Sequence, residues 1–312
     1  MITRRLSDSH IQDLTALLKE AGEYLKGVQP LIVEHGNKLN WKKTAIVQDV
    51  REAQGWRNKD SLSTAADMVA ERGIHEALRK INPQIIEHLN LGESELDKYG
   101  YIPEISEERD EAKNVAAFKN YETYWVVDPL DNTSDFAKLG PRKGESYSSN
   151  IALIHKGEVI WGGIIFPGKG ELYYTGDDGK AYLEKEGADK KWQKPKIITV
   201  NAEPKHPNKQ AIRTPQTQLC QIMSPVKAKG GGISACGQRR ACLVASGSGD
   251  YCHETTNYRL WDTAPIAVIM KAAGGALLKL DGTPLDVVKD LDMTGDEYQD
   301  DIFALPPYMA GN

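Results

Sequence analysis

The sequence predicts a layered fold of the α/β or α+β class. Before residue 82, apolar residues recur at helical spacing in two stretches. From Tyr124 onward, short runs rich in Val, Ile and Tyr alternate with turns, as is typical of strands. Further helical stretches follow, and such mixing of strands with helices indicates sheets covered by helices. The 312 residues suffice for one large domain or two closely packed ones.

A first helix is expected from Asp8 or Ser9, either of which can cap it. Residues 27–60 are polar and predict a loop with a short helix. A second helix is expected from residue 63 or 64 to Ile81, where Asn82-Pro83 should end it, with a loop at 87–100. The apolar side of the first helix consists of Leu14, Leu17, Leu18, Ala21 and Leu25.

The middle of the chain predicts strands. YWVVD, which begins at Tyr124, indicates a buried strand. SSNIALIHKGEVIWGGIIFP indicates two strands around a turn at Lys156-Gly157, and ELYYTGDDGKAYLE a hairpin around Asp178-Gly179. Residues 185–210 are rich in Lys, Pro and Asn and predict a connector.

The last third predicts two helices and a strand pair. One helix is expected from Arg240 to Ser246. A second, from Ala264 to Ala273, should end at Gly274-Gly275. The stretch ALLKLDGTPL is expected to form two short strands.

Composition and charge exclude several classes of protein. With 40% hydrophobic and 27% charged residues, the chain is typical of soluble globular proteins. The net charge of -5 is spread along the sequence, so we expect neither a nucleic-acid polymer nor a membrane surface as partner. There is no apolar run of about eighteen residues and no apolar core of a signal peptide near the start. The 4 cysteines form no C-x-x-C pair, so we expect no zinc site, and a cytoplasmic location with reduced thiols.

Two carboxylates stand where the run from Tyr124 ends, in WVVDPLDNTSDF. Asp128 and Asp131 are separated by Pro129, whose ring fixes the backbone. Such a rigid bend can direct both carboxylates and the Leu130 carbonyl toward one point, and Mg²⁺ prefers oxygen ligands. The alternative is an Asp-Pro turn that only caps the following helix.

Three further acids lie at expected element boundaries. Glu107 follows the apolar stretch PEI, Asp67 lies in the first turn of the second helix, and Asp262 opens a later helix. For Asp67 and Asp262, the helix dipole alone is a sufficient explanation. Taken together, however, acids at several boundaries fit one metal cluster better than separate caps. A helix beginning at residues 132–135 could offer free N–H groups to a phosphate, so we expect a metal-dependent phosphoryl site.

These motifs resemble the lithium-sensitive, magnesium-dependent phosphatase superfamily of inositol monophosphatase and fructose bisphosphatase. That family carries an E-E pair, then D-P-[apolar]-D-G-T, and far downstream W-D-x-A. This chain has SEE, DPLDNT and WDTA, while TAAD, GESYSSNIALI, AAGGALLKLDGTPL and AGN occur in matching order from about Lys59 onward. The resemblance is strongest to the bacterial 3'(2'),5'-bisphosphate nucleotidase branch.

The resemblance implies an α-β-α-β-α sandwich of two halves with the site between them. Residues 1–200 would carry most metal ligands, and 201–312 the WDTA motif and substrate contacts. Asp67 and Thr133 would orient and deprotonate the attacking water. Homodimers are frequent in the family, so a homodimer is one expected assembly. Two or three Mg²⁺ ions would be held by Glu107, Asp128, the Leu130 carbonyl, Asp131 and Asp262.

The chain departs from the family at the expected substrate contacts. Asn132, which with Thr133 would border the phosphate, stands where the family usually has Gly. Asn tolerates a positive φ next best, so it could preserve the turn and yet crowd the phosphate. Arg240 replaces a Lys and could hold a second phosphate with two hydrogen bonds, or be an exposed helix cation. His253 replaces an Arg, and could meet a phosphate or be a surface histidine.

The leading hypothesis is a Mg²⁺-dependent phosphomonoesterase that acts on a small phosphate ester. The favoured substrate is 3'-phosphoadenosine 5'-phosphate, which would give AMP and phosphate. An inositol or other sugar phosphatase is the alternative within the same class. A non-catalytic metal- or phosphate-binding protein on this fold is the alternative from another class, and only Asn132 supports it.

Overall fold

A computed structural model of the chain describes residues 5–38, 65–109, 111–136, 147–201, 237–249, 251–254, 258–279, 281–291, 304–305 and 308–311. Its large mixed sheet is built from β1 (Glu104–Ser106), β2 (Thr123–Asp131), β3 (Ser148–His155), β4 (Glu158–Phe166), β5 (Glu171–Thr175), β6 (Ala181–Lys185) and β7 (Lys196–Ile198). These strands lie side by side in chain order. β1 is parallel to β2, and every other neighbouring pair is antiparallel.

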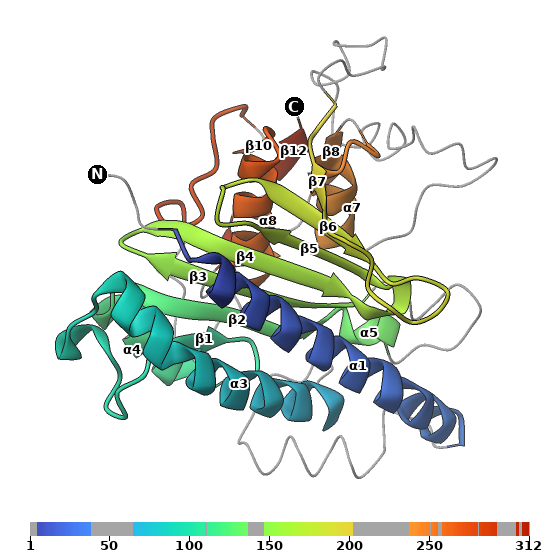
Figure 1. Ribbon diagram of the computed structural model, residues 1–312, viewed down its shortest axis with the longest axis horizontal. Helices are drawn as coiled ribbons and strands as arrows, with labels where there is room; N and C mark the ends of the chain where they lie inside the picture. The colour runs from blue at the N-terminus through green and yellow to red at the C-terminus, as the bar shows by residue number, and fades with distance from the viewer. Residues whose placement is uncertain are drawn as a thin grey trace.

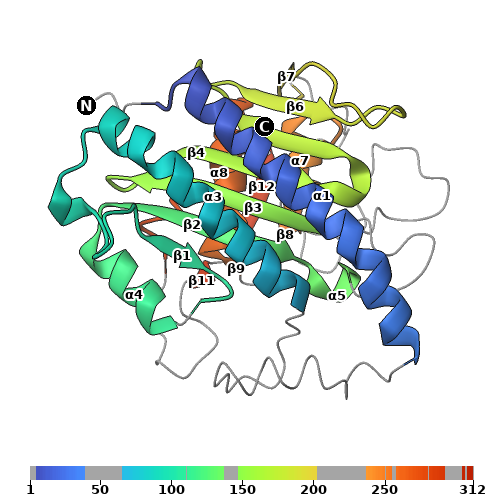
Figure 2. The same ribbon diagram turned by 60° about the horizontal axis from the view of Figure 1, so that its bottom comes forward.

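Helices cover both faces of this sheet (Figure 1). The described helices are α1 (Asp8–Lys38), α3 (Ala65–Leu89), α4 (Glu111–Asn120), α5 (Thr133–Phe136), α7 (Gly237–Ala245) and α8 (Leu260–Ala272), with short 3-10 turns at Glu93–Glu95 and Pro167–Lys169. α1 and α3 cross one face, and α8 crosses the other. α4 flanks the β1 edge of the sheet (Figure 2), and its Ala117 belongs to the same core as Leu260 and Ala264 of α8.

A second, smaller sheet packs against α7 and α8. Its strands are β8 (Tyr251–Glu254), β10 (Ala276–Lys279) and β12 (Tyr308–Gly311), in the order β10-β12-β8, and a separate pair joins β9 (Tyr258–Arg259) to β11 (Ala304–Leu305). The described residues therefore supply four of the five expected layers. The predicted α/β class is confirmed.

β2 shows why the middle strands read as continuous apolar runs. Trp125 and Val127 belong to the core under α1 and α3, whereas Tyr124 and Val126 belong to the core under α8. Because successive side chains of a strand point to opposite faces, a strand covered on both sides needs apolar residues at every position.

Two adjacent glycines in β4 let helices approach both faces of the sheet closely. A Cβ on Gly162 would lie 2.8 Å from the backbone oxygen of Pro265 in α8. A Cβ on Gly163 would lie 2.6 Å from Leu18 in α1. Distances below 3.0 Å are not tolerated by real Cβ atoms, so close helix packing requires glycine here.

Two predicted helix ends are wrong, and tertiary packing explains one of them. α3 continues past Pro83 to Leu89, because Ile85 and Leu89 are buried in the core under α1 and α3. A proline removes one hydrogen bond and strains the preceding turn, a cost that such burial can offset. α1 likewise continues past Pro30 to Lys38, where a loop was expected from residue 27.

The predicted strands and turns of the middle region are confirmed. β3 and β4 meet at Lys156 and Gly157, which have φ of 51° and 77°, as a tight hairpin requires. The connector at 185–210 does contain one unexpected strand, β7, at the sheet edge. The second strand expected in ALLKLDGTPL is reduced to a bridge between Leu278 and Pro284, since β10 pairs with β12 instead. None of the described helices is long and apolar enough to cross a membrane.

Candidate active site

A β-bulge at the end of β2 brings the two carboxylates of the DPLD motif to the same side. Asp128 is paired with Asn150 and Asp131 with Ser148, so one extra residue lies on β2 between the two pairs. In a regular strand, residues three apart point to opposite faces. The extra residue therefore returns Asp131 to the same face as Asp128. A bulge is also one of the few places where a strand tolerates a proline such as Pro129.

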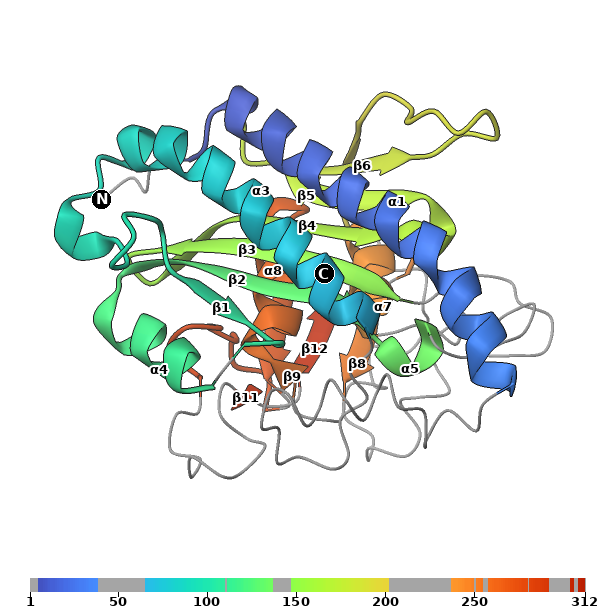
Figure 3. The ribbon, with the colours of Figure 1, turned by 90° about the horizontal axis from the view of Figure 1, so that it is seen from below.

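Three acids from two distant segments meet at this point. One carboxylate oxygen each of Asp128, Asp131 and Asp262 lies within 4.8 Å of the others. Glu107 joins them, because its carboxyl interacts with those of both Asp128 and Asp262. The ends of β1 and β2, the beginnings of α3 and α8, and α5 lie around this edge of the large sheet (Figure 3).

Asp262 caps the beginning of α8 and also belongs to the acidic cluster. Its Oδ2 accepts a hydrogen bond of 2.9 Å from the backbone N–H of Arg259, as an acid in the first turn of α8 is expected to do. The same side chain reaches Asp128 and Asp131. The two explanations considered for this acid are therefore compatible rather than exclusive.

The acids repel one another in this arrangement. Burial, and then the charges of Glu107, Asp131 and Asp262, raise the pKa of Asp128 well above its usual range. Desolvation by the surrounding protein, and then the charges of Asp262, Glu108 and Asp67, raise the pKa of Glu107 as well, although Glu107 is an exposed residue. Burial raises the pKa of Asp262 to about 6.

Converging carboxylates fit a divalent cation. A set made only of carboxylate oxygens, with the Leu130 carbonyl beside it, matches hard cations such as Mg²⁺ or Mn²⁺ and not zinc, which favours Cys and His. A bound cation would replace mutual repulsion by attraction and lower the raised pKa values. The described acidic cluster is thus able to hold a metal ion.

Thr133 and Asp67 form a hydrogen-bonded pair beside the cluster. The Thr133 hydroxyl donates to Asp67 Oδ1 at 2.9 Å and lies 3.1 Å from the Leu130 carbonyl oxygen. The hydroxyl has one proton, and the buried Asp67 carboxylate is the nearer of the two acceptors. Asp67 lies in the first turn of α3, where the helix dipole also favours it.

Asn132 has the backbone conformation that its replacement of glycine requires. Its φ is 62°, in the left-handed region, and Thr133 begins α5 directly after it. Asn therefore preserves the turn at little cost. The expected helix after DPLD exists, but α5 is only 4 residues long, so its dipole is small.

Two neighbours of the acids on β3 were not anticipated. The Asn150 amide donates to Asp128 Oδ2 at 3.4 Å, and the Ser148 hydroxyl donates to Asp131 Oδ2 at 3.2 Å. Both side chains are buried. Ser148 and Asn150 stand two positions apart in SYSSNIALI, and this spacing predicts that both lie on one face of a strand. The spacing points to the acids only when the pairing register between β2 and β3 is known.

The expected substrate contacts lie in the C-terminal part. Arg240 is in α7 and is half-buried. His253 is in β8, paired with Met309 of β12. α7 and β8 pack against each other.

The chain is similar to known proteins over most of its length. Residues 16–300 match the profile of the inositol monophosphatase family. The chain belongs to the inositol monophosphatase family. Membership confirms the resemblance inferred from the sequence and the expectation of a phosphatase of this family.

Relatives within the family include nucleotidases and an inositol phosphatase. The chain is 30% identical over 234 residues to the 3'(2'),5'-bisphosphate nucleotidase CysQ of Salmonella typhimurium, which covers 74% of this chain and 81% of the relative. It is 28% identical over 200 residues to inositol monophosphatase 1 of Rattus norvegicus, and this match covers 62% of this chain and 68% of the relative.

Solved structures of the family share the fold. CysQ from Bacteroides thetaiotaomicron superposes with a TM-score of 0.53 at 21% identity, covering 97% of both chains. An IMPase from Thermotoga maritima superposes with a TM-score of 0.57 at 17% identity, covering 97% of this chain and 92% of the other. The mixed sheet with helices on both faces is therefore the fold of the inositol monophosphatase type.

Proposed function

We propose that the chain is a Mg²⁺-dependent 3'(2'),5'-bisphosphate nucleotidase that hydrolyses 3'-phosphoadenosine 5'-phosphate to AMP and phosphate. The observation that carries the catalytic part is the Thr133–Asp67 pair, 2.9 Å long, directly beside the acidic cluster. The substrate part is supported by the 30% identity to the nucleotidase of Salmonella typhimurium.

In this proposal, the cations are held by Glu107, Asp128, the Leu130 carbonyl, Asp131 and Asp262. When bound, Mg²⁺ supplies positive charge that makes water more acidic and neutralises charge on the phosphoryl group. The Thr133 hydroxyl donates a hydrogen bond to Asp67, which turns its lone pair toward the attacking water; as Thr133 accepts a proton from that water, it passes its own proton to Asp67. The new P–O bond forms as the bond from phosphorus to the 3' oxygen breaks, and that oxygen takes a proton from solvent water, so that AMP leaves as the alcohol.

A nucleotidase that acts on a bisphosphate nucleotide must bind a second phosphate, which inositol monophosphate does not have. Arg240 and His253 are the candidates in the half 201–312, and a guanidinium can hold phosphate with two hydrogen bonds. An inositol or other sugar phosphatase remains the second candidate, favoured by the 28% identity to the rat inositol monophosphatase.

The non-catalytic alternative rested on Asn132 alone. Its φ of 62° lies in the region that Asn tolerates, which argues that the turn is intact. An idle site would also have no physical reason to hold repelling carboxylates this close together.

Phosphate release tests the proposal. Purified protein is given 3'-phosphoadenosine 5'-phosphate, inositol monophosphate or fructose 1,6-bisphosphate, each with Mg²⁺ and again with EDTA. We expect Mg²⁺-dependent turnover with the nucleotide having the highest kcat/KM. A higher kcat/KM for either sugar phosphate would reassign the substrate, and inertness toward all three would contradict the enzymatic proposal.

A further inference from the structure

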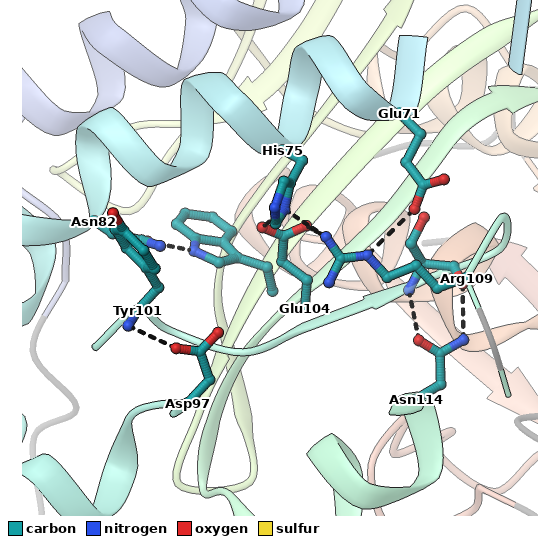
Figure 4. A network of polar contacts seen from close by, with 10 residues as sticks. Glu71, His75, Asn82, Asp97, Tyr101, Glu104, Arg109 and Asn114 are labelled. Carbon is teal, nitrogen blue, oxygen red and sulfur yellow. Dashed lines mark hydrogen bonds and ion pairs between the residues drawn. The ribbon is translucent and has the colours of Figure 1, made fainter. Parts of the chain in front are cut away.

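The guanidinium of Arg109, two positions after Glu107, joins β1 to α3 (Figure 4). Arg109 Nη2 lies 2.8 Å from Glu104 Oε2, and Arg109 Nε lies 3.3 Å from Glu71 Oε1. Nη2 also contacts His75 Nδ1. Glu104 opens β1, and both Glu71 and His75 belong to α3. Arg109 therefore connects a strand and a helix that are far apart in the sequence.

Glu104 explains why a cation is needed at this place. Its side chain is 4% exposed, and a buried carboxylate without a partner is costly. Arg109 meets one of its oxygens, and His75 Nδ1 lies 2.7 Å from the other. Arg109 reaches Glu104 through Nη2, while its Nε–H donates to Glu71 Oε1 at 3.3 Å.

The groups that Arg109 connects carry two residues of the proposed site. Glu107 lies in the turn between Glu104 and Arg109, whose ion pair spans five positions. Asp67 lies one helical turn before Glu71 in α3. The bond from Arg109 to Glu71 therefore relates the turn that carries a proposed metal ligand to the helix that carries the proposed base.

Other contacts hold the turn on its remaining sides. The backbone N–H of Glu107 donates to the Val127 oxygen of β2 at 3.2 Å. Asn114 of α4 accepts from the Ser106 N–H at 3.1 Å and donates to the Ser106 oxygen at 2.8 Å. These bonds fix the turn to β2 and α4. α3 is joined to this region by Glu71, which contacts Arg109 and also interacts with Ser106, and by His75, which contacts Glu104 and Arg109.

We propose that Arg109 is a positioning residue for divalent-cation binding, because it holds the Glu107 turn and α3 at the separation that the site needs. This inference rests on the proposed function. A positioning role and simple electrostatics predict opposite changes in metal affinity. A positive side chain repels a metal ion, so loss of the Arg109 charge alone would tighten metal binding. Loss of a positioning contact weakens metal binding, by about ten-fold or more for outer-shell partners.

The test is calorimetric titration of the full chain with Mg²⁺ alone, without substrate. Wild type is compared with Arg109→Lys, which keeps the charge but loses the planar set of guanidinium N–H donors, and with Arg109→Gln, which loses both the charge and this set of donors. Lys19→Gln is the matched control, because the Lys19–Glu184 ion pair of 2.8 Å has side-chain exposures of 24% and 9%, close to the 25% and 4% of Arg109 and Glu104. Thermal melting and circular dichroism report folding.

We expect Mg²⁺ affinity to fall in the order wild type, Arg109→Lys, Arg109→Gln, with about a ten-fold loss in the last and less than two-fold in Lys19→Gln. Unchanged or tighter binding by a folded Arg109→Gln would overturn the proposal. If wild type itself binds no Mg²⁺, the proposed function fails instead.

A second pair of variants serves if Arg109→Gln does not fold. Glu71→Met removes the acceptor for Arg109 Nε, whereas Glu71→Gln keeps an acceptor oxygen and removes only the charge. We expect Glu71→Gln to bind Mg²⁺ several-fold more tightly than Glu71→Met. Equal Mg²⁺ affinities in the two variants would show that the hydrogen bond from Arg109 to Glu71 does not support metal binding, and would overturn the proposal.

Discussion

The Thr133 hydroxyl donates to Asp67 across 66 positions of sequence, at 2.9 Å. Neither residue belongs to the acidic triad, yet both lie beside it, since Thr133 Oγ1 also lies 3.1 Å from the Leu130 carbonyl between the two aspartates of DPLD. We therefore expect the pair to act on a water and not to bind a metal.

Thr133→Val should lower kcat by about 10²- to 10⁴-fold while Mg²⁺ affinity stays near that of wild type, because it removes the proton acceptor and none of the proposed metal ligands. Thr133→Ser should recover most of the rate. Steady-state kinetics with a separate Mg²⁺ titration measure both quantities. Thr123→Val is the matched control: Thr123 is buried at the other end of β2, 2.8 Å from His155 Nδ1. A Thr133→Val enzyme with the control's kcat would remove Thr133 from the mechanism.

Asn150→Ala should weaken Mg²⁺ binding by about 10- to 100-fold, since the amide holds Asp128 in place from β3. Titration with Mg²⁺ measures the effect. Asn82→Ala offers a comparison, because Asn82 is equally buried but bonds to Trp125 Nε1 in the core under α3. Both variants should lose stability, and only Asn150→Ala should lose affinity. Equal affinities in the two variants would argue against a positioning role.

Asn132→Gly should leave kcat within about three-fold of wild type, because the φ of 62° is already available to Asn. Asn132→Ala should cost about 1–2 kcal/mol of stability, since Ala pays the steric penalty of the left-handed region. Kinetics and denaturant melts measure these changes. A rate gain of a hundred-fold or more in Asn132→Gly would mean instead that the native side chain obstructs the phosphate.

Metal-free protein should become less stable as the pH rises from 5 to 8. Burial raises the pKa of Asp262 to about 6, so the folded state binds this proton more tightly than the unfolded state. The resulting stabilisation is complete below the unfolded pKa and is lost as the pH rises through the folded value. Between pH 5 and 8, the loss from Asp262 is on the order of 1–1.5 kcal/mol.

Melts in EDTA across this pH range measure the effect. Excess Mg²⁺ should reduce the loss, because ionised carboxylates bind the cation. Asp262→Asn should flatten the profile, since its amide does not titrate. Superimposable profiles for wild type and Asp262→Asn in EDTA are the result that this explanation does not permit.

Much of the fold was predictable because local pattern and tertiary role agree. Tyr124 to Val127 are apolar at every position, and β2 is indeed covered on both faces. The end of α3 was not predictable in the same way. Asn82-Pro83 is a strong local stop signal, but the burial of Ile85 and Leu89 depends on a sheet formed by residues far along the chain.

The acids of the site could be found because each stands at an element boundary within a spaced motif. Their supports could not. Ser148 and Asn150 matter only through the bulged register between β2 and β3. Arg109 reads as an ordinary surface charge after SEE, and its role depends on the distance between the end of β1 and α3. Such contacts arise between elements and leave no local signature.

Convergence of four acids around shared cations is the central claim, and anomalous scattering from crystals grown with Mn²⁺ tests it most directly. Mn²⁺ accepts the same oxygen ligands as Mg²⁺ and gives an element-specific signal. The account predicts one or more peaks among the carboxylates of Glu107, Asp128, Asp131 and Asp262. Fully ordered carboxylates with no peak between them, at a Mn²⁺ concentration that supports turnover, would contradict it.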